Sequence, residues 1–150
     1  MSAEHFDGIG ARPDAFLPDL ASSLNNLGGD LSNLGRREEA LAASQEAVDI
    51  RMRLAATRSD AFLPDLASSL GAHSSVLAAL DRHHEAARMV ADALRIILPY
   101  AERYRELTRT ITADVLRYND AAGQAPDQAL LERAAQALAP SGEEQAERRS

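Results

Sequence analysis

The stretch DAFLPDLASSL occurs twice in this chain without a change, at residues 14–24 and again 46 residues later, at residues 60–70. Eleven identical residues in a row indicate a duplicated structural unit, because self-similarity at a fixed offset marks a repeat architecture. The duplication continues more faintly downstream at the same offset. The matching pairs are Leu31 with Leu77, Leu34 with Leu80, Arg36 with Arg82, Glu39 with Glu85, Ala40 with Ala86, Ala47 with Ala93, Ile50 with Ile96 and Ala55 with Ala101. Most of these residues are apolar or small, as a core shared by the two repeats requires.

The composition favours packed helices. Of the 150 residues, 45% are apolar but only 4% are aromatic, whereas strands are rich in β-branched and aromatic residues. The absence of cysteine excludes a disulfide framework, a thiolate nucleophile and a cysteine metal site. A net charge of −7 argues against nucleic acid or an anionic membrane as the partner. The length suits one domain with a sizeable core.

The two ends of the chain differ from its middle. The start, MSAEHFDGIG, lacks the basic and apolar blocks of a signal peptide, and the longest uncharged stretch, residues 66–80, is too short and too polar to span a bilayer. We therefore expect a soluble, cytoplasmic protein. Residues 1–12 show no periodicity and are expected to be a flexible lead-in, and the polar residues 140–150 are expected to be a disordered tail. The repeat domain is then residues 13–139.

Apolar periodicity divides the first unit into two helices. Pro18 is expected to start the first helix, because a proline fits the first helical turn, and Gly35 to end it. The second helix begins near Arg37, and so short a connection makes the two helices antiparallel neighbours. Small residues at Gly28 and Ala40 would allow a close approach. The inward-facing stripes are Leu20, Leu24, Leu27, Leu31 and Leu34 on the first helix, and Ala40, Ala43, Ala47, Ile50 and Leu54 on the second.

The pattern restarts after a turn expected at residues 57–62, with Pro64 starting the third helix. The stripes of the third and fourth helices are Leu66, Leu70, His73, Leu77 and Leu80, and Ala86, Met89, Ala93, Ile96 and Tyr100. Past Pro99 the pattern decays. A fifth helix with Leu107, Ile111, Val115 and Tyr118, a break at residues 123–126 and a sixth helix with Leu130, Leu131, Ala134 and Leu138 form a worn third repeat that acts as a cap.

These residues resemble the tetratricopeptide repeat family. Residues 24–31, LNNLGGDL, look like the first helix of that repeat, W-x-x-L-G-x-x-Y, with leucines in place of both aromatics. Ala40, Ser44 and Ala47 resemble A-x-x-x-F-x-x-A of the second helix, with serine replacing the aromatic. Gly35 sits at the family's turn glycine. The period is longer than the usual 34 residues and nearer to the extended repeats of kinesin light chains and their bacterial relatives. The resemblance covers residues 13–138.

The resemblance implies an all-α superhelix of helical hairpins, whose first helices line a concave groove for peptides. The groove positions carried over are Ser22, Asn25, Asn26, Gly29, Ser32 and Asn33 in the first repeat, and Ser68, Gly71, Ala72, Ser75, Ala78 and Ala79 in the second. These residues lie off the leucine stripe, yet they are uncharged. An asparagine amide both donates and accepts hydrogen bonds, so it suits an extended backbone. No basic residue stands at these positions, so capture of chaperone carboxylate tails is not expected.

Other polar residues have ordinary structural interpretations. His73 is expected to be a hydrogen-bonded core histidine, with a pH-sensing role as the alternative. His83 and His84 are expected to be exposed and to bind no metal, since adjacent histidines on a helix point about 100° apart. On the fifth helix, the arginines interleave with acids, which indicates pairing within the helix and not a nucleic-acid patch.

We expect a module that binds a protein or peptide through the groove, without catalysis, cofactor or metal. A self-assembling structural element with no peptide ligand is the alternative, and an enzyme built on Asp81, His84 and Glu85 is a third reading. The first repeat is the best formed, and little precedes it. Its outer edge should therefore expose leucine surface, which suggests a homodimer through the N-terminal end.

Overall fold

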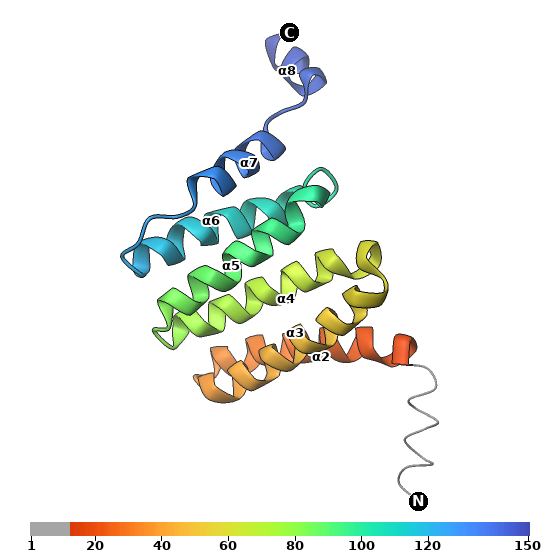
Figure 1. Cartoon of the computed structure of the whole chain (residues 1–150), viewed down its shortest axis with the longest axis vertical. Helices are drawn as coiled ribbons and strands as arrows, with labels where there is room; N and C mark the ends of the chain where they lie inside the picture. Colours follow the sequence, from red (N-terminus) through yellow and green to blue (C-terminus); the bar gives the residue numbers. More distant parts are fainter. Residues whose placement is uncertain (1–12) are drawn as a thin grey trace, which may run out of the picture.

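The computed structural model describes residues 13–150, and all the regular structure in this range is helical. The elements are α2 (Pro13–Asn33), α3 (Arg37–Thr57), α4 (Ser59–Ala79), α5 (His83–Ile97), the 3₁₀-helix η1 (Leu98–Tyr100), α6 (Arg105–Ala121), α7 (Gln128–Leu138) and α8 (Gly142–Arg149). From α2 to α7, consecutive helices pack against each other and the hairpins are stacked in chain order (Figure 1). The prediction of an all-α solenoid is confirmed. The expected lead-in, residues 1–12, lies outside the described residues.

The three hairpins turn in the same way. Gly35, Asp81 and Gly123 all adopt the left-handed conformation, with φ of 78°, 60° and 68°. After each of them, the next amide donates to the carbonyl five residues back. These bonds are Arg36 to Leu31 at 2.9 Å, Arg82 to Leu77 at 2.9 Å and Gln124 to Asn119 at 3.0 Å. This is the Schellman ending of a helix. Three residues then connect α2 to α3 and α4 to α5, and six connect α6 to α7. The turn expected at Gly35 is confirmed, and the worn third repeat, α6 and α7, keeps it.

The predicted helix starts at Pro18 and Pro64 are wrong. Both prolines lie inside a helix, α2 and α4 respectively. The turn expected at residues 57–62 is wrong as well, since only Arg58 separates α3 from α4. Pro64 is tolerated because it is the sixth residue of α4, and its missing N–H leaves only the Asp60 carbonyl without a helical donor.

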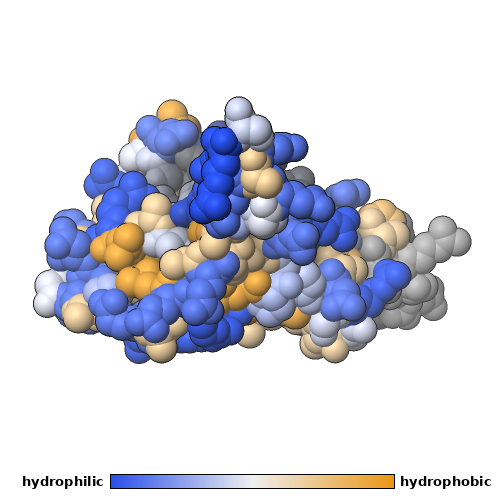
Figure 2. All heavy atoms as spheres, turned by 90° about the horizontal axis from the view of Figure 1, so that it is seen from above, coloured by the Kyte–Doolittle hydropathy of each residue, from blue (hydrophilic) through white to orange (hydrophobic). Residues whose placement is uncertain are grey.

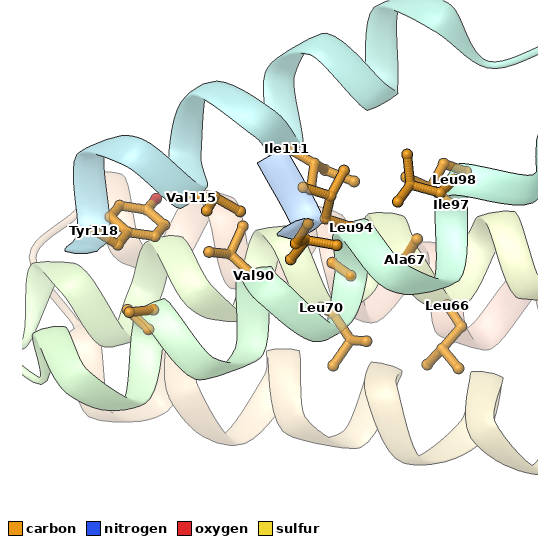
Figure 3. Packing of buried hydrophobic residues seen from close by; sticks show 14 of the residues in the cluster. Leu66, Ala67, Leu70, Val90, Leu94, Ile97, Leu98, Ile111, Val115 and Tyr118 are labelled. Atoms are coloured by element: carbon orange, nitrogen blue, oxygen red, sulfur yellow. The ribbon is translucent and has the colours of Figure 1, made fainter. Parts of the chain in front are cut away.

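The largest core cluster lies between α3, α4, α5, α6 and α7. Figure 3 shows Val90 and Leu94 of α5 facing Ile111 and Val115 of α6. The stripe predicted for α3 is buried throughout, and that of α4 is buried from Leu66 to Leu77. On α5 the predicted face is partly wrong. Met89, Ile96 and Tyr100 are half-buried, whereas Val90, Leu94 and Ile97 are fully covered, because α5 packs between α4 and α6.

The predicted stripe of α2 is only half buried. Leu31 is covered and Leu24 partly so, but Leu20, Leu27 and Leu34 are 44%, 47% and 71% exposed. Ala21 and Gly28 face α3 in their place: a Cβ on Gly28 would meet the Ala40 carbonyl oxygen at 3.4 Å. The close approach expected of these small residues is therefore present. The other leucines are exposed because no element within residues 13–150 packs on the outer side of α2.

The C-terminal part ends in polar helices. The predicted inward residues Ile111, Val115 and Tyr118 of α6 and Leu130 and Ala134 of α7 are buried. The tail, expected to be disordered, instead forms α8, all of whose residues are exposed. Its signal in the sequence is a capping box: the Ser141 side chain accepts from the Glu144 amide, and the Glu144 carboxylate accepts from the Ser141 amide. None of the helices in the described range has the length and low polarity needed to cross a bilayer.

Candidate functional groove between α2 and α4

A polar hollow of about 200 Å³ lies between the first helices of the two complete repeats. Its walls come from α2 and α4, and its floor includes Ser44 of α3. The lining residues are Asn25, Gly28, Gly29, Ser32, Asn33, Ser44, Ala72, Ser75 and Val76. None of these residues is charged. Six of the twelve predicted groove positions thus lie together around one hollow: Asn25, Gly29, Ser32, Asn33, Ala72 and Ser75.

The other six predicted groove positions lie outside this hollow: Ser22, Asn26, Ser68, Gly71, Ala78 and Ala79. Asn26 is exposed, Ser68 is half-buried and Ser22 is exposed. The Ser22 hydroxyl accepts a hydrogen bond of 3.1 Å from Arg51 Nη2. Although Ser22 is exposed, its hydroxyl therefore holds α2 to α3.

Asn25 links the two repeats. Its Nδ2 donates to Ser69 Oγ at 3.1 Å, and its Oδ1 is buried without a partner among the described residues. Buried polar groups normally find a partner, and a bond between repeats stabilises their packing. The two asparagines, expected to act alike, therefore differ: Asn25 is tied into the fold and Asn26 is free at the surface.

A buried arginine links α2, α3 and α4. Arg51 of α3 is 8% exposed, and its guanidinium reaches α2 and α4 at once. It donates to the Asp65 carbonyl at 3.1 Å, to Ser69 Oγ at 2.8 Å and to Ser22 Oγ at 3.1 Å. Burial lowers the pKa of Arg51 and the charge of Asp65 partly offsets this, but an arginine stays protonated. A positive charge therefore lies buried between the three helices, bonded to neutral oxygens.

Arg51 was not among the predicted site residues, because those were taken from the first helix of each repeat and Arg51 lies on a second helix, α3. A signal was present, since Arg51 falls in register with Ile97, 46 residues later, and Ile97 is fully buried. An arginine at the position equivalent to a core isoleucine must bury its methylene groups, and its guanidinium must find hydrogen-bond partners.

His73 forms a buried pair with Ser44. His73 Nδ1 and Ser44 Oγ are 2.7 Å apart, and the hydroxyl also donates to the Leu41 carbonyl at 3.1 Å. Burial and the nearby charge of Arg82 lower the pKa of His73, against the charges of Asp49 and Glu85. A serine beside a histidine resembles a nucleophile and its base, and the sequence analysis found no such pair. However, Ser44 is 1% exposed, and its hydroxyl is bonded within the core. The prediction of a hydrogen-bonded core histidine is confirmed.

A second hollow opens on the opposite face, between the second helices α3 and α5. It holds about 420 Å³ and is mostly apolar. Its lining residues are Gln45, Val48, Met52, Leu66, Leu70, His73, Met89, Asp92, Arg95 and Ile96. The sequence analysis missed it because Met89 and Ile96 were assigned to the interior. This apolar groove is larger than the polar one, so size alone does not select the functional face.

The remaining polar residues are structural. His83 is half-buried rather than exposed, with its Nε2 3.5 Å from Asp81, and His84 is exposed and bonds Gln124 at 3.1 Å. No group of three metal-binding side chains occurs between residues 13 and 150. The pairing predicted within the fifth helix is present on α6, where Arg109 pairs with Glu106 at 2.6 Å and Arg117 pairs with Asp114.

The architecture is that of a helical repeat solenoid, in which stacked hairpins share one core and expose a groove. The family model described as Tetratricopeptide repeat matches residues 20–55, which cover most of α2 and α3. The first hairpin is thus similar to the tetratricopeptide repeat, and repeats of this kind are generally protein–protein interaction modules. No curated protein and no solved structure matches it significantly.

Proposed function

We propose that this chain binds an extended segment of a partner protein in the polar groove between α2 and α4, and that it catalyses no reaction. The observation that carries the proposal is the hollow itself, which lies between two first helices and is lined by uncharged residues. An ordinary solvated helix face carries charges. Here the exposed or half-exposed Ser32, Asn33 and Ser75 offer donors and acceptors instead.

The geometry suits a peptide backbone. Gly29 is exposed, and a Cβ placed on it would meet nothing within 4 Å, so the chain of a partner can approach the helix closely. Asn33 supplies both a donor and an acceptor at the rim. We assign the binding role to Gly29, Ser32, Asn33 and Ser75, which line the groove. Ser22 and Asn25 act mainly by holding the helices around it together.

The test is a selection of random phage-displayed peptides on the purified protein, followed by calorimetry with a selected peptide. Gly29→Arg fills the groove without a clash and should weaken binding by more than about tenfold. Asn33→Ala should weaken it about fivefold, as for one lost hydrogen bond. Ala56→Arg is the matched control, because Ala56 is exposed on α3 and lines neither hollow; its affinity should not change.

The apolar groove between α3 and α5 is the competing binding site, and a variant in it can contradict the proposal. If Met52→Arg abolished binding of the selected peptide while Gly29→Arg left it intact, the apolar face between α3 and α5 would be the binding site. The proposal for the polar groove would then be wrong. Self-assembly, the second candidate function, concerns a different surface and is favoured by the exposed leucines of α2.

A further inference from the structure

The outer face of α2 carries a row of exposed apolar side chains. Phe16, Leu20, Leu27 and Leu34 are 53%, 44%, 47% and 71% exposed. Spacings of four, seven and seven residues put them on one side of the helix, along about 27 Å of its length. The other large exposed apolar residues of the described chain, Met52 and Leu116, stand alone on α3 and α6.

The duplicated sequence allows the outer face of α2 to be compared with the equivalent face of α4. In α4, the residues 46 positions later are Phe62, Leu66, His73 and Leu80. Phe62 and Leu80 are half-buried, and Leu66 and His73 are only 7% and 3% exposed. There α3 covers the face: Leu66 shares a core cluster with Val48 and Ala55, and His73 bonds Ser44. This face of α4 is thus a helix–helix interface, and the corresponding face of α2 is an interface without its covering helix.

Two differences indicate what covers it. Where α4 has His73, bonded to a serine of α3, α2 has Leu27, so no polar contact selects an α3-like helix. Leu20, Leu27 and Leu34 instead form an uninterrupted row of leucines, whereas His73 interrupts the corresponding row of α4. Such a row suits a second apolar helix face.

The opposite end of the solenoid offers no matching surface. Every residue of α8 is exposed and most are charged or polar, and the outward residues of α7 include Gln128, Glu132, Arg133 and Gln136. Figure 2, seen from the α8 end, is largely hydrophilic apart from a limited apolar area on one side. Head-to-tail stacking would place the leucines of α2 against this polar end. An isologous contact, in which both copies use the same patch, buries them and closes after two subunits.

We propose that the outer face of α2 is a homodimer interface, in which Phe16, Leu20, Leu27 and Leu34 of one protomer pack against the same residues of a second copy. The polar groove stays open in this dimer. Its residues Gly29 and Ser32 lie on a different side of α2, since each residue turns the helix by about 100°. Dimerisation therefore presents two grooves in one assembly.

Sedimentation of the full chain from low to high micromolar concentration tests this proposal. The wild type should sediment as a monomer–dimer equilibrium. Leu27→Glu should weaken the dimer by more than about tenfold, as for a side chain at the centre of an interface. Leu116→Glu is the matched control, because Leu116 is 50% exposed on α6, and its dimer should keep the wild-type affinity. Leu34→Glu, at a position 71% exposed, gives a second variant whose folding is not at risk, and circular dichroism checks both.

Three outcomes would overturn the proposal. The first is a wild type that remains monomeric throughout, which would mean that residues 1–12 or another protein cover the face. The second is assembly beyond a dimer, and the third is a dimer that Leu27→Glu and Leu34→Glu leave unchanged. The Gly29→Arg variant separates this proposal from the proposed function, because it should dimerise normally whether or not the groove binds peptide.

Discussion

The same eleven residues occur in two environments in this molecule. In α4, Leu66 is 7% exposed and Ser69 is fully buried, whereas in α2 the equivalent Leu20 is 44% exposed and Ser23 is on the surface. Both copies are helical, so the sequence determines the local structure. The burial of each residue is determined by the neighbouring hairpin, which α4 has and α2 lacks within the described residues.

The polar contacts differ in the same way. Ser69 Oγ accepts from Arg51 at 2.8 Å and from Asn25 at 3.1 Å, so it joins three helices. Ser23 has no hydrogen bond of this kind among the described residues. One serine is therefore a structural link between repeats, and its identical twin is a surface residue.

The largest expected difference concerns the duplicated leucines. Leu66→Ala should lower the free energy of unfolding by about 2 to 4 kcal/mol, because it opens a cavity in the core. Leu20→Ala should lower it by less than about 1 kcal/mol, because nearly half of that side chain is already exposed. Urea unfolding of dilute protein, where a dimer does not contribute, measures both. Equal losses would show that the first repeat is covered as the second is.

The equivalent turns at Gly35 and Asp81 should give smaller changes in stability, and the two changes should have opposite signs. Gly35→Ala should destabilise the fold by about 1 kcal/mol, since a Cβ is strained at φ of 78°. Asp81→Gly should stabilise it by about 0.5 kcal/mol, because Asp81 occupies the equivalent turn with φ of 60°. Thermal unfolding of both variants checks this. A loss of stability in Asp81→Gly would mean that the contact of Asp81 with His83 outweighs the strain.

The smallest effect is a pH dependence that belongs to the second repeat. The pKa of His73 is lowered in the folded protein by burial and by Arg82, so the unfolded chain binds a proton first. Its contribution to stability is complete above the unfolded pKa of about 6.5 and is lost as the pH falls from there towards the folded pKa. His73→Leu, which recreates the Leu27 of the first repeat, should remove this part of the acid sensitivity in denaturant titrations. An unchanged pH profile would assign the sensitivity to carboxylates.

Much of the fold was predictable from the periodicity of the chain. Stripes such as Ala40, Ala47 and Leu54 follow from local sequence, as does the turn at Gly35. Pro18 and Pro64 misled the prediction because a proline is tolerated a full turn beyond the helix start as well as within the first turn. The exposure of Leu20 and Leu27 could not be read from the stripe, because periodicity shows which side is apolar but not whether anything covers it.

The groove was predictable only in part. Gly29, Ser32, Asn33 and Ser75 meet as the family resemblance implied, because equivalent positions of stacked repeats line one face. The role of Asn25 depends on a serine 44 residues away, and that of Arg51 depends on three helices meeting. Such contacts arise from how the hairpins stack, which the sequence of one helix does not contain.

Hydrogen exchange of the two identical stretches, resolved residue by residue by NMR, tests the central claim most directly. Residues 14–24 and 60–70 have the same intrinsic exchange rates, so any difference in protection reports what covers each helix. In dilute protein, the amides of the first stretch should exchange much faster than those of the second, and the gap should narrow at high concentration as α2 pairs with a second copy. Equal protection of the two stretches at every concentration would contradict the account.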